Sequence, residues 1–495
     1  MAAGRGQRFG DGRALTDHDL PEHGIGEGFP SARVLGIVND VAHGWKCTWI
    51  RASLNGWAGS VLDPLAMAGS GSSAFDVIVI GGGPAGSAAA TRLAQRGHRI
   101  LLLEKQHFPR FHIGESMLPC VMPLIEQLGA MPRLKAADFL PKYAAEFVTA
   151  DGSLRRRYAF RDGLVQGAAS AYEVDRSEFD KLLLDNAGEQ GVDVRQGAQV
   201  IRFELDAKPG VSVVARLDDG SETTFHAAML IDASGQASLL AGRLGLREMD
   251  QELKNFAVFS HYEGAARSSG EEEGDISVVL VPGGWWWVIP LRNNRTSVGL
   301  VGPSRNLHGQ KPDEAYFAAQ IANTPFVRDR LASATRVAPV RSVSDYSYVS
   351  KKLVGDRFVL VGDAAAFIDP VFSTGVYLGI VGAFRAAEVV DAALRAGKFE
   401  RSRFLSYERE AQKNVAIYRR FVKGFYTPEF VDVLMSPSDW LSLRAAITSL
   451  LAGFGVDRFD VNWRVQVFRA IARANKRFGF VPRVLDLPSS AESRP

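Results

Sequence analysis

The chain has 495 residues, of which 46% are hydrophobic and 23% charged, an ordinary globular composition with room for about two to four domains. Its net charge of +3 is too small to indicate nucleic-acid binding, and two cysteines, Cys47 and Cys120, exclude a disulfide framework and show no metal-ligand spacing. No run reaches the ~18–20 apolar residues of a membrane helix and no secretory signal is present, so we expect a cytoplasmic protein without a membrane span, nucleic acid or metal.

Residues 1–74 differ in composition from the rest of the chain. They are rich in Gly, Asp, His and Arg, show no sustained hydrophobic period, and end in a Gly/Ser joint at 69–73. We predict a poorly ordered N-terminal extension. Three tryptophans, Trp45, Trp49 and Trp57, leave a small docking element open as an alternative.

Regular structure is predicted to begin with a βαβ unit. The β-branched run 75–80 suits a buried parallel strand, 87–96 has helical spacing, and 99–103 is a second strand that ends in Glu104. Between strand and helix lies the pattern Gly81-x-Gly83-x-x-Gly86. Its glycines allow a tight turn and close approach to a pyrophosphate at the helix N-terminus, and Glu104 is placed to bind ribose hydroxyls. This combination predicts a dinucleotide site.

The following segments predict a second, sheet-rich layer. Runs 192–195, 211–217 and 223–225 suggest antiparallel strands, 229–232 and 358–361 are buried strands, and 253–345 is rich in strands. A helix is predicted over 376–396. We therefore expect a mixed α/β fold: a Rossmann-like domain over 75–400, interleaved with an antiparallel-sheet substrate domain at about 140–175 and 240–345, and a helical C-terminal region at 401–495.

Three later segments favour FAD over NAD. The strand ending in Gly362-Asp363, the segment Asp232–Gly235, and Arg176 at a predicted helix start resemble the corresponding parts of hydroxylase-type FAD enzymes. That resemblance implies that Asp363 approaches the ribityl and pyrophosphate groups. With the segment described next, it gives the expected cofactor-binding set: Gly81, Gly82, Gly83, Ala85, Gly86, Glu104, Arg110, Gly114, Glu115, Ser116, Arg176, Asp363 and Val376.

Four further motifs narrow the family. They are 109–119 (PRFHIGESMLP), 139–147 (FLPKYAAEF) with Lys142, 284–290 (GWWWVIP), which fits GWxWxIP, and 367–376 (FIDPVFSTGV). Together they resemble the flavin-dependent halogenases, above all those that act on phenols and pyrroles. The resemblance covers about residues 75–425.

The resemblance implies a chemistry for these residues. Reduced flavin and O2 form a C4a-hydroperoxide, which oxidises halide to hypohalous acid. Thr374 and Gly375 are implied to bind the halide, and Lys142 to relay the oxidant to an electron-rich phenol or pyrrole. Trp285 and Trp287, expected on one face of a strand, separate flavin from substrate. Glu146 is a candidate for removing the ring proton.

The implied cofactors are FAD, used as FADH2, and chloride or bromide. Because the chain has no second GxGxxG, we expect a separate flavin reductase. The aromatic substrate is either free or tethered to a carrier protein, which the basic segment 401–423 could dock. Two alternatives remain: a flavin monooxygenase or geranylgeranyl-reductase-like oxidoreductase, and a catalytically idle FAD-binding protein that docks a carrier.

Overall fold

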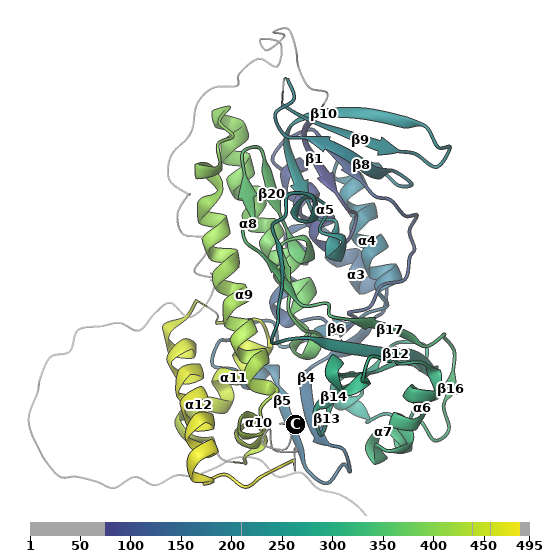
Figure 1. Cartoon of the computed structure of the whole chain (residues 1–495), viewed down its shortest axis with the longest axis vertical. Helices are drawn as coiled ribbons and strands as arrows, with labels where there is room; N and C mark the ends of the chain where they lie inside the picture. The colour runs from purple at the N-terminus through teal and green to yellow at the C-terminus, as the bar shows by residue number, and fades with distance from the viewer. Residues whose placement is uncertain (1–74, 209, 438, 456, 486–495) are drawn as a thin grey trace, which may run out of the picture. The chain divides into compact units, whose positions relative to one another are not determined.

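The computed structural model describes residues 75–485, apart from 209, 438 and 456. The predicted N-terminal extension, residues 1–74, lies outside these ranges. Among the described residues are two eight-stranded sheets and two smaller ones, with helices between them and towards the C-terminus (Figure 1). None of the described helices has the length and apolar character needed to cross a membrane.

The first sheet contains the predicted βαβ unit and is mainly parallel. Its strands follow the order β19-β20-β10-β1-β2-β7, and β8 and β9 extend it antiparallel from β10. β1 pairs parallel with β2 on one side and β10 on the other, so its carboxyl end opens at the centre of the sheet. The strands are β1 (Phe75–Ile80), β2 (Ile100–Leu103), β7 (Asp193–Arg195), β8 (Gln199–Glu204), β9 (Val211–Arg216), β10 (Glu222–Asp232), β19 (Val354–Gly355) and β20 (Phe358–Leu360).

Two sequence predictions for this sheet were wrong. The run at 192–195 is not antiparallel: β7 pairs parallel with β2 at the sheet edge. An edge strand of three half-buried residues lacks the continuous apolar run that marks a central parallel strand. The runs at 223–225 and 229–232 are also not separate strands. They form the single strand β10, whose first half pairs antiparallel with β9 and whose second half pairs parallel with β1 and β20.

The second sheet is almost entirely antiparallel, in the order β16-β12-β15-β14-β13-β4-β5, with β17 also paired to β12. Its one parallel pair joins β4 to β13, and between these two strands the chain forms β7 to β10 of the first sheet. The predicted mixed α/β fold is thereby confirmed. The strands are β4 (Ala144–Thr149), β5 (Arg155–Ala159), β12 (Asn255–Glu263), β13 (Ile276–Val281), β14 (Gly284–Pro290), β15 (Arg295–Pro303), β16 (Thr335–Arg336) and β17 (Arg341–Ser344).

Two small sheets and a set of helices complete the described chain. The small sheets pair β3 (Leu140–Lys142) with β6 (Ala171–Glu173), and β11 (Arg247–Met249) and β21 (Ala366–Phe367) with β18 (Tyr348–Ser350). The helices are α1 (Pro84–Ala94), α2 (Met122–Gln127), α3 (Met131–Ala136), α4 (Arg176–Glu189), α5 (Leu239–Arg243), α6 (Glu314–Ala322), α7 (Pro325–Arg330), α8 (Thr374–Ala396), α9 (Leu405–Phe425), α10 (Pro428–Met435), α11 (Leu443–Leu451) and α12 (Phe459–Phe478).

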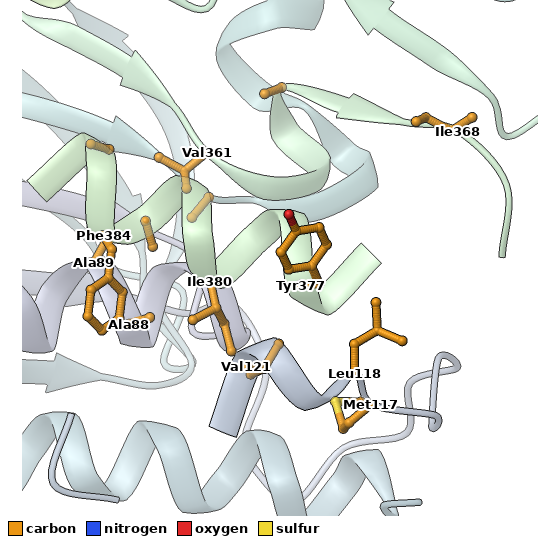
Figure 2. Close-up of a cluster of buried hydrophobic side chains, with 14 of the residues drawn as sticks. Ala88, Ala89, Met117, Leu118, Val121, Val361, Ile368, Tyr377, Ile380 and Phe384 are labelled. Carbon is orange, nitrogen blue, oxygen red and sulfur yellow. The ribbon is translucent and has the colours of Figure 1, made fainter. Parts of the chain in front are cut away.

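Small residues allow α1 and α8 to pack closely. Figure 2 shows Ala88 and Ala89 of α1 beside Ile380 and Phe384 of α8 in the buried core. A Cβ added to Gly379 of α8 would lie 3.3 Å from the Cβ of Ala85, which is tighter than most such contacts. This packing brings the N-terminus of α8 close to the glycine turn that precedes α1.

The basic segment 401–423 makes ion pairs within the chain. Arg401 pairs with Glu408, Arg419 with Asp250, and Lys423 with Glu252. These three side chains bind the chain's own acidic residues, which favours an intramolecular role over the docking role considered from the sequence.

Candidate active site

The glycine turn between β1 and α1 forms a cradle with no space for a side chain at Gly81 or Gly86. Gly81 has a φ of +102°, and a Cβ there would lie 2.3 Å from the carbonyl oxygen of Ala233. A Cβ on Gly86 would lie 1.9 Å from the carbonyl oxygen of Gly81. Gly83 caps α1 without a side-chain hydrogen bond, so the first amides of the helix are left for a ligand, as in pyrophosphate-binding turns.

Glu104, at the end of β2, is held by main-chain amides. Its carboxylate accepts hydrogen bonds from the N–H of Gly82 at 2.7 Å and from the N–H of Gln106 at 2.9 Å. The side chain is buried and lines the cavity beside the turn. Its position at the mouth of the cradle fits the predicted contact with ribose hydroxyls.

Arginines also line the cavity beside the cradle. Arg176, the first residue of α4, makes two hydrogen bonds to Asp180 and donates to the carbonyl oxygens of Ile113 and Gly114. Arg110 Nη1 lies 3.0 Å from the same Asp180 carboxylate. Burial raises the pKa of Asp363 to about 6, opposed by the nearby Arg176 guanidinium. The cavity wall therefore carries both positive charge and a carboxyl group that is easily protonated.

A single cavity of about 330 Å³ connects these groups to the second sheet. Most of the predicted cofactor residues line it: Gly81, Gly83, Ala85, Glu104, Arg110, Gly114, Glu115, Ser116, Arg176, Asp363 and Val376. Gly82 and Gly86 lie behind this surface and shape the turn. A glycine cradle that side chains would block, an acceptor for ribose and an apolar far end together fit a flavin dinucleotide.

Two indoles form the far end of the cavity. Trp285 and Trp287 of β14 lie on one face, with ring centroids 6.1 Å apart, and both line the cavity. Trp285 donates to the Tyr426 hydroxyl at 3.0 Å, and Trp287 to the Ser297 hydroxyl at 3.1 Å. The predicted alternation is confirmed, because Trp286 packs against Phe317 on the opposite face.

The N-terminus of α8 lies beside this wall. Ser373 precedes the helix with a φ of +55°, and Gly375 and Val376 line the cavity. Thr374, predicted to bind halide together with Gly375, is buried and is not among the cavity-lining residues. Its side chain is therefore turned away from the open space, whereas Gly375 leaves the backbone accessible there.

Asp369, just before α8, connects three elements. Its carboxylate accepts hydrogen bonds from Asn255 of β12 at 3.0 Å, from the Tyr426 hydroxyl at 2.9 Å and from the N–H of Val371 at 3.1 Å. Burial raises the pKa of Asp369 to about 6, although these hydrogen bonds oppose the shift. Tyr426 thus links the Asp369 loop to the indole of Trp285.

Lys142 lies behind the cavity wall. Its ammonium group donates to the Ser116 hydroxyl at 2.6 Å and to the Met117 carbonyl at 3.2 Å. Ser116 lines the cavity and Lys142 does not. Burial lowers the pKa of Lys142, and the carboxyl groups of Glu173 and Asp275 oppose that shift.

A second buried pair faces the cavity at Glu115. One carboxylate oxygen lies 2.6 Å from Nε2 of His261 on β12, and the other has no hydrogen-bond partner among the described residues. Sequence analysis did not identify His261, because no motif connects it to the GESMLP segment. Its place in the strand-rich region 253–345 was its only signal.

Glu146 does not take the position expected of a base for the substrate. It accepts hydrogen bonds from Arg155 and from Ser277 at 2.9 Å, and it does not line the cavity. It therefore has a structural environment in the second sheet. Among the described residues there is also no group of three or more His, Cys, Asp and Glu side chains that could hold a metal.

Comparison with known proteins identifies the same part of the chain. A family model described as an FAD binding domain matches residues 74–421. The chain is 33% identical over 448 residues to the 1H-pyrrole-2-carbonyl-(peptidyl-carrier protein) chlorinase of Pseudomonas fluorescens, which covers 85% of this chain and 94% of the relative. It is 36% identical over 360 residues to the tryptophan 2-halogenase of Chondromyces crocatus, covering 72% and 68%.

Solved structures show a similar fold. The myxobacterial chondrochloren halogenase superposes with a TM-score of 0.67 at 31% identity, covering 81% of this chain and 90% of that chain. A flavoprotein/dehydrogenase from Cytophaga hutchinsonii superposes with a TM-score of 0.75 at 29% identity, covering 82% and 99%.

Proposed function

Because the chain belongs to the flavin-dependent halogenases and contains their FAD-binding domain, we propose that it halogenates an electron-rich aromatic ring, a phenol or pyrrole, through a relay at Lys142. One observation carries this proposal: a single cavity extends from the glycine cradle to the tryptophan pair, and Ser116, which binds Lys142, lines it. The halide is chloride or bromide.

FAD supplies the oxidising chemistry when it is bound in reduced form, since with O2 it converts halide to hypohalous acid. The residues that would hold it are the backbone of Gly81–Gly86 at the pyrophosphate, Glu104 at the ribose and Asp363 beside Arg176. Only one cradle of this kind occurs among the described residues. A separate flavin reductase is therefore the proposed source of reduced cofactor.

The start of α8 is the proposed halide site. Gly375 presents backbone to the cavity, and the first amides of a 23-residue helix attract an anion. Thr374 would contribute its main-chain N–H, because its side chain is buried away from the open space. A site built from amides binds halide by hydrogen bonds and leaves no side chain to compete for the oxidant.

The tryptophan pair would keep the substrate away from the flavin. Bulky indoles fixed by Tyr426 and Ser297 exclude a ring from direct contact, so only a small oxidant passes. The ammonium group of Lys142, with Ser116 at the cavity surface, would then hold that oxidant by hydrogen bonds and direct it to the ring.

The names of the relatives describe two kinds of substrate. The names of two relatives describe carrier-bound pyrroles, chlorinated in Pseudomonas fluorescens and brominated in Pseudoalteromonas luteoviolacea, and a third names tryptophan. We propose the electron-rich ring as the common requirement. Phenols and pyrroles should therefore be offered both free and as thioesters of a carrier protein.

The test is an assay with FAD, a flavin reductase, NADH, O2 and bromide, with products identified by mass spectrometry. The wild-type chain should give brominated product only when halide is present. Lys142→Ala should lower its formation by about 10²–10⁴-fold while FAD binding is retained, the range expected when a proton-donating group is removed. Lys181→Ala, on the exposed face of α4, is the matched control and should keep full activity.

Two results would contradict the proposal. Oxygenated product formed without halide would instead support a monooxygenase. Bromination that continues in Lys142→Ala would remove the relay role of that lysine.

A further inference from the structure

Three buried side chains form a hydrogen-bonded series, and the proposed halogenation assigns no role to the third of them. Lys142 Nζ donates to the Ser116 hydroxyl at 2.6 Å, and that hydroxyl donates to Glu173 Oε1 at 3.0 Å. The direct distance from Lys142 Nζ to Glu173 Oε1 is 4.0 Å. Ser116 therefore bridges a cation and a carboxyl group that lie close together without a direct hydrogen bond.

These groups are almost fully removed from water. Lys142 is 1% exposed and Glu173 is 0% exposed, and Glu173 Oε2 has no hydrogen-bond partner among the described residues. A lone charge in such a place is costly, whereas an opposite charge nearby recovers much of that cost. Each of the two groups therefore depends on the other for its charged form.

Other charged groups also face this pair. Asp275 is near both residues but already binds Arg157 and the amides of Tyr143 and Ala144. Glu115 lies near Glu173 and binds His261. The face of the Phe160 ring is 5.4 Å from Lys142 Nζ. Glu173 is thus the carboxyl group of this set that reaches Lys142 through a single hydroxyl and has an oxygen left over.

The position of Ser116 gives the series a direction. Ser116 lines the cavity, whereas Lys142 and Glu173 lie behind it. Two strands fix this arrangement, since Lys142 ends β3 and Glu173 ends β6, and the two strands pair with each other. Ser116 also forms an isolated bridge to Glu173 in the backbone.

We propose that the charge of Glu173 keeps Lys142 protonated and that the two groups exchange a proton through the Ser116 hydroxyl, which makes Glu173 a positioning residue for that lysine. This inference rests on the role proposed above for Lys142. In the exchange, Lys142 Nζ passes a proton to Ser116 Oγ while the Ser116 hydroxyl proton passes to Glu173. Two protons each cross one hydrogen bond, so the net transfer is one proton from Lys142 to Glu173; nothing is oxidised or reduced, and the reverse transfer restores the ammonium group.

The direction of the pKa shifts agrees with this geometry. Burial lowers the pKa of Lys142 and raises the pKa of Glu173 to about 8, while each group's charge opposes the shift of the other. Removing the carboxylate leaves only the more distant acidic groups to stabilise the ammonium. The pKa of Lys142 should therefore fall further in Glu173→Gln.

The first test measures protonation directly. In full-length protein labelled with [13C,15N]lysine, NMR titration should show Lys142 losing its proton at a pH at least about one unit lower in Glu173→Gln than in wild type, a tenfold change in the equilibrium. The Lys142→Arg variant assigns the signal. The matched control is Glu408→Gln, which neutralises a buried glutamate bonded to the Leu353 amide and should leave the Lys142 titration unchanged. Identical titrations in wild type and Glu173→Gln would overturn the inference.

The second test measures halogenation against pH. In Glu173→Gln, the alkaline limb of kcat should move to lower pH by a similar amount, with KM little changed and kcat reduced at least tenfold at pH 8. Glu173→Asp should restore part of this loss. Ser116→Ala should lower kcat while Lys142 keeps most of its normal titration, because the counter-charge stays nearby. A uniform loss at every pH, or loss of FAD binding, would indicate a structural role and overturn the inference.

These tests separate two kinds of failure. Wild-type protein that incorporates no halide would contradict the proposed function, and the NMR titration would still decide whether Glu173 controls Lys142. Wild-type protein that halogenates, with Glu173→Gln unchanged in both titration and pH profile, would contradict the inference alone.

Discussion

The two ends of the cavity are built in different ways. The cradle end is formed by the backbone of one continuous turn, Gly81–Gly86, supported by Glu104 at the end of the next strand. The far end depends on side chains from distant segments: Trp285 of β14 lines the cavity, and Lys142 of β3, Glu173 of β6 and Tyr426, just after α9, lie behind its surface. A site made of backbone tolerates almost no added atom, whereas a site made of side chains depends on each hydrogen bond between them.

The largest effect is expected in the cradle, where alanine at two glycines should separate an effect on folding from an effect on FAD binding. Gly86→Ala places a Cβ 1.9 Å from a main-chain oxygen, so it should destabilise the chain and weaken FAD binding by at least ~100-fold, or about 2.7 kcal/mol. Gly83→Ala meets only the end of Arg110, at 3.5 Å, and should weaken FAD binding without changing urea unfolding. Flavin fluorescence titration measures the FAD affinity of each variant. Normal FAD affinity in Gly86→Ala would show that the cradle has room to adjust.

At the far end, substitutions on the two faces of β14 test the indoles separately. Trp287→Leu opens the wall and removes the hydrogen bond to Ser297, so halogenated product per NADH consumed should fall about tenfold, with more halide-independent oxidation. Trp286→Leu, on the opposite face of the same strand, should cost about 2–4 kcal/mol of stability with an unchanged product ratio. Equal effects of the two substitutions on the product ratio would argue against a wall.

The smallest effect is expected at Asp363, which lines the same cavity. Because its pKa in the folded chain is about 6, above its ordinary value of 3.8, its favourable contribution is complete below pH 4 and is lost as the pH rises through 6. FAD-free Asp363→Asn should therefore be more stable than wild type at pH 8, by about 1–2 kcal/mol, and equal to it near pH 4. Urea unfolding at the two pH values measures this difference. A variant less stable than wild type at pH 8 would contradict it.

The comparison also explains what the sequence could predict. The glycine turn, the place of Glu104 at the end of a strand and the strand before Asp363 were predicted correctly because each follows from a local pattern of glycines and buried residues. The alternation of Trp285 and Trp287 followed from strand geometry alone. The space that accepts Trp287 could not be predicted in this way. It depends on Gly299 of the neighbouring strand, where a Cβ would lie 2.2 Å from the indole.

The missed residues are those held by long-range contacts. Glu173, His261 and Tyr426 reach the site across pairs of elements that are far apart in the chain, and none lies in a motif with Lys142 or Trp285. The error at 192–195 has a similar origin, since the partner of an edge strand is set by the sheet around it. Local sequence patterns predict where the strands lie, but they do not always predict which strands pair with each other.

The order of strands in the first sheet has a consequence for the newly made chain on the ribosome. β1 leaves the ribosome early, yet its neighbour β10 is made about 150 residues later and β20 later still. The parallel pair of β4 and β13 must likewise wait for the second of them to be made. These apolar strands of the nascent chain therefore remain without one of their final partners over a long stretch of translation, and chaperone assistance during expression should increase the yield of folded protein.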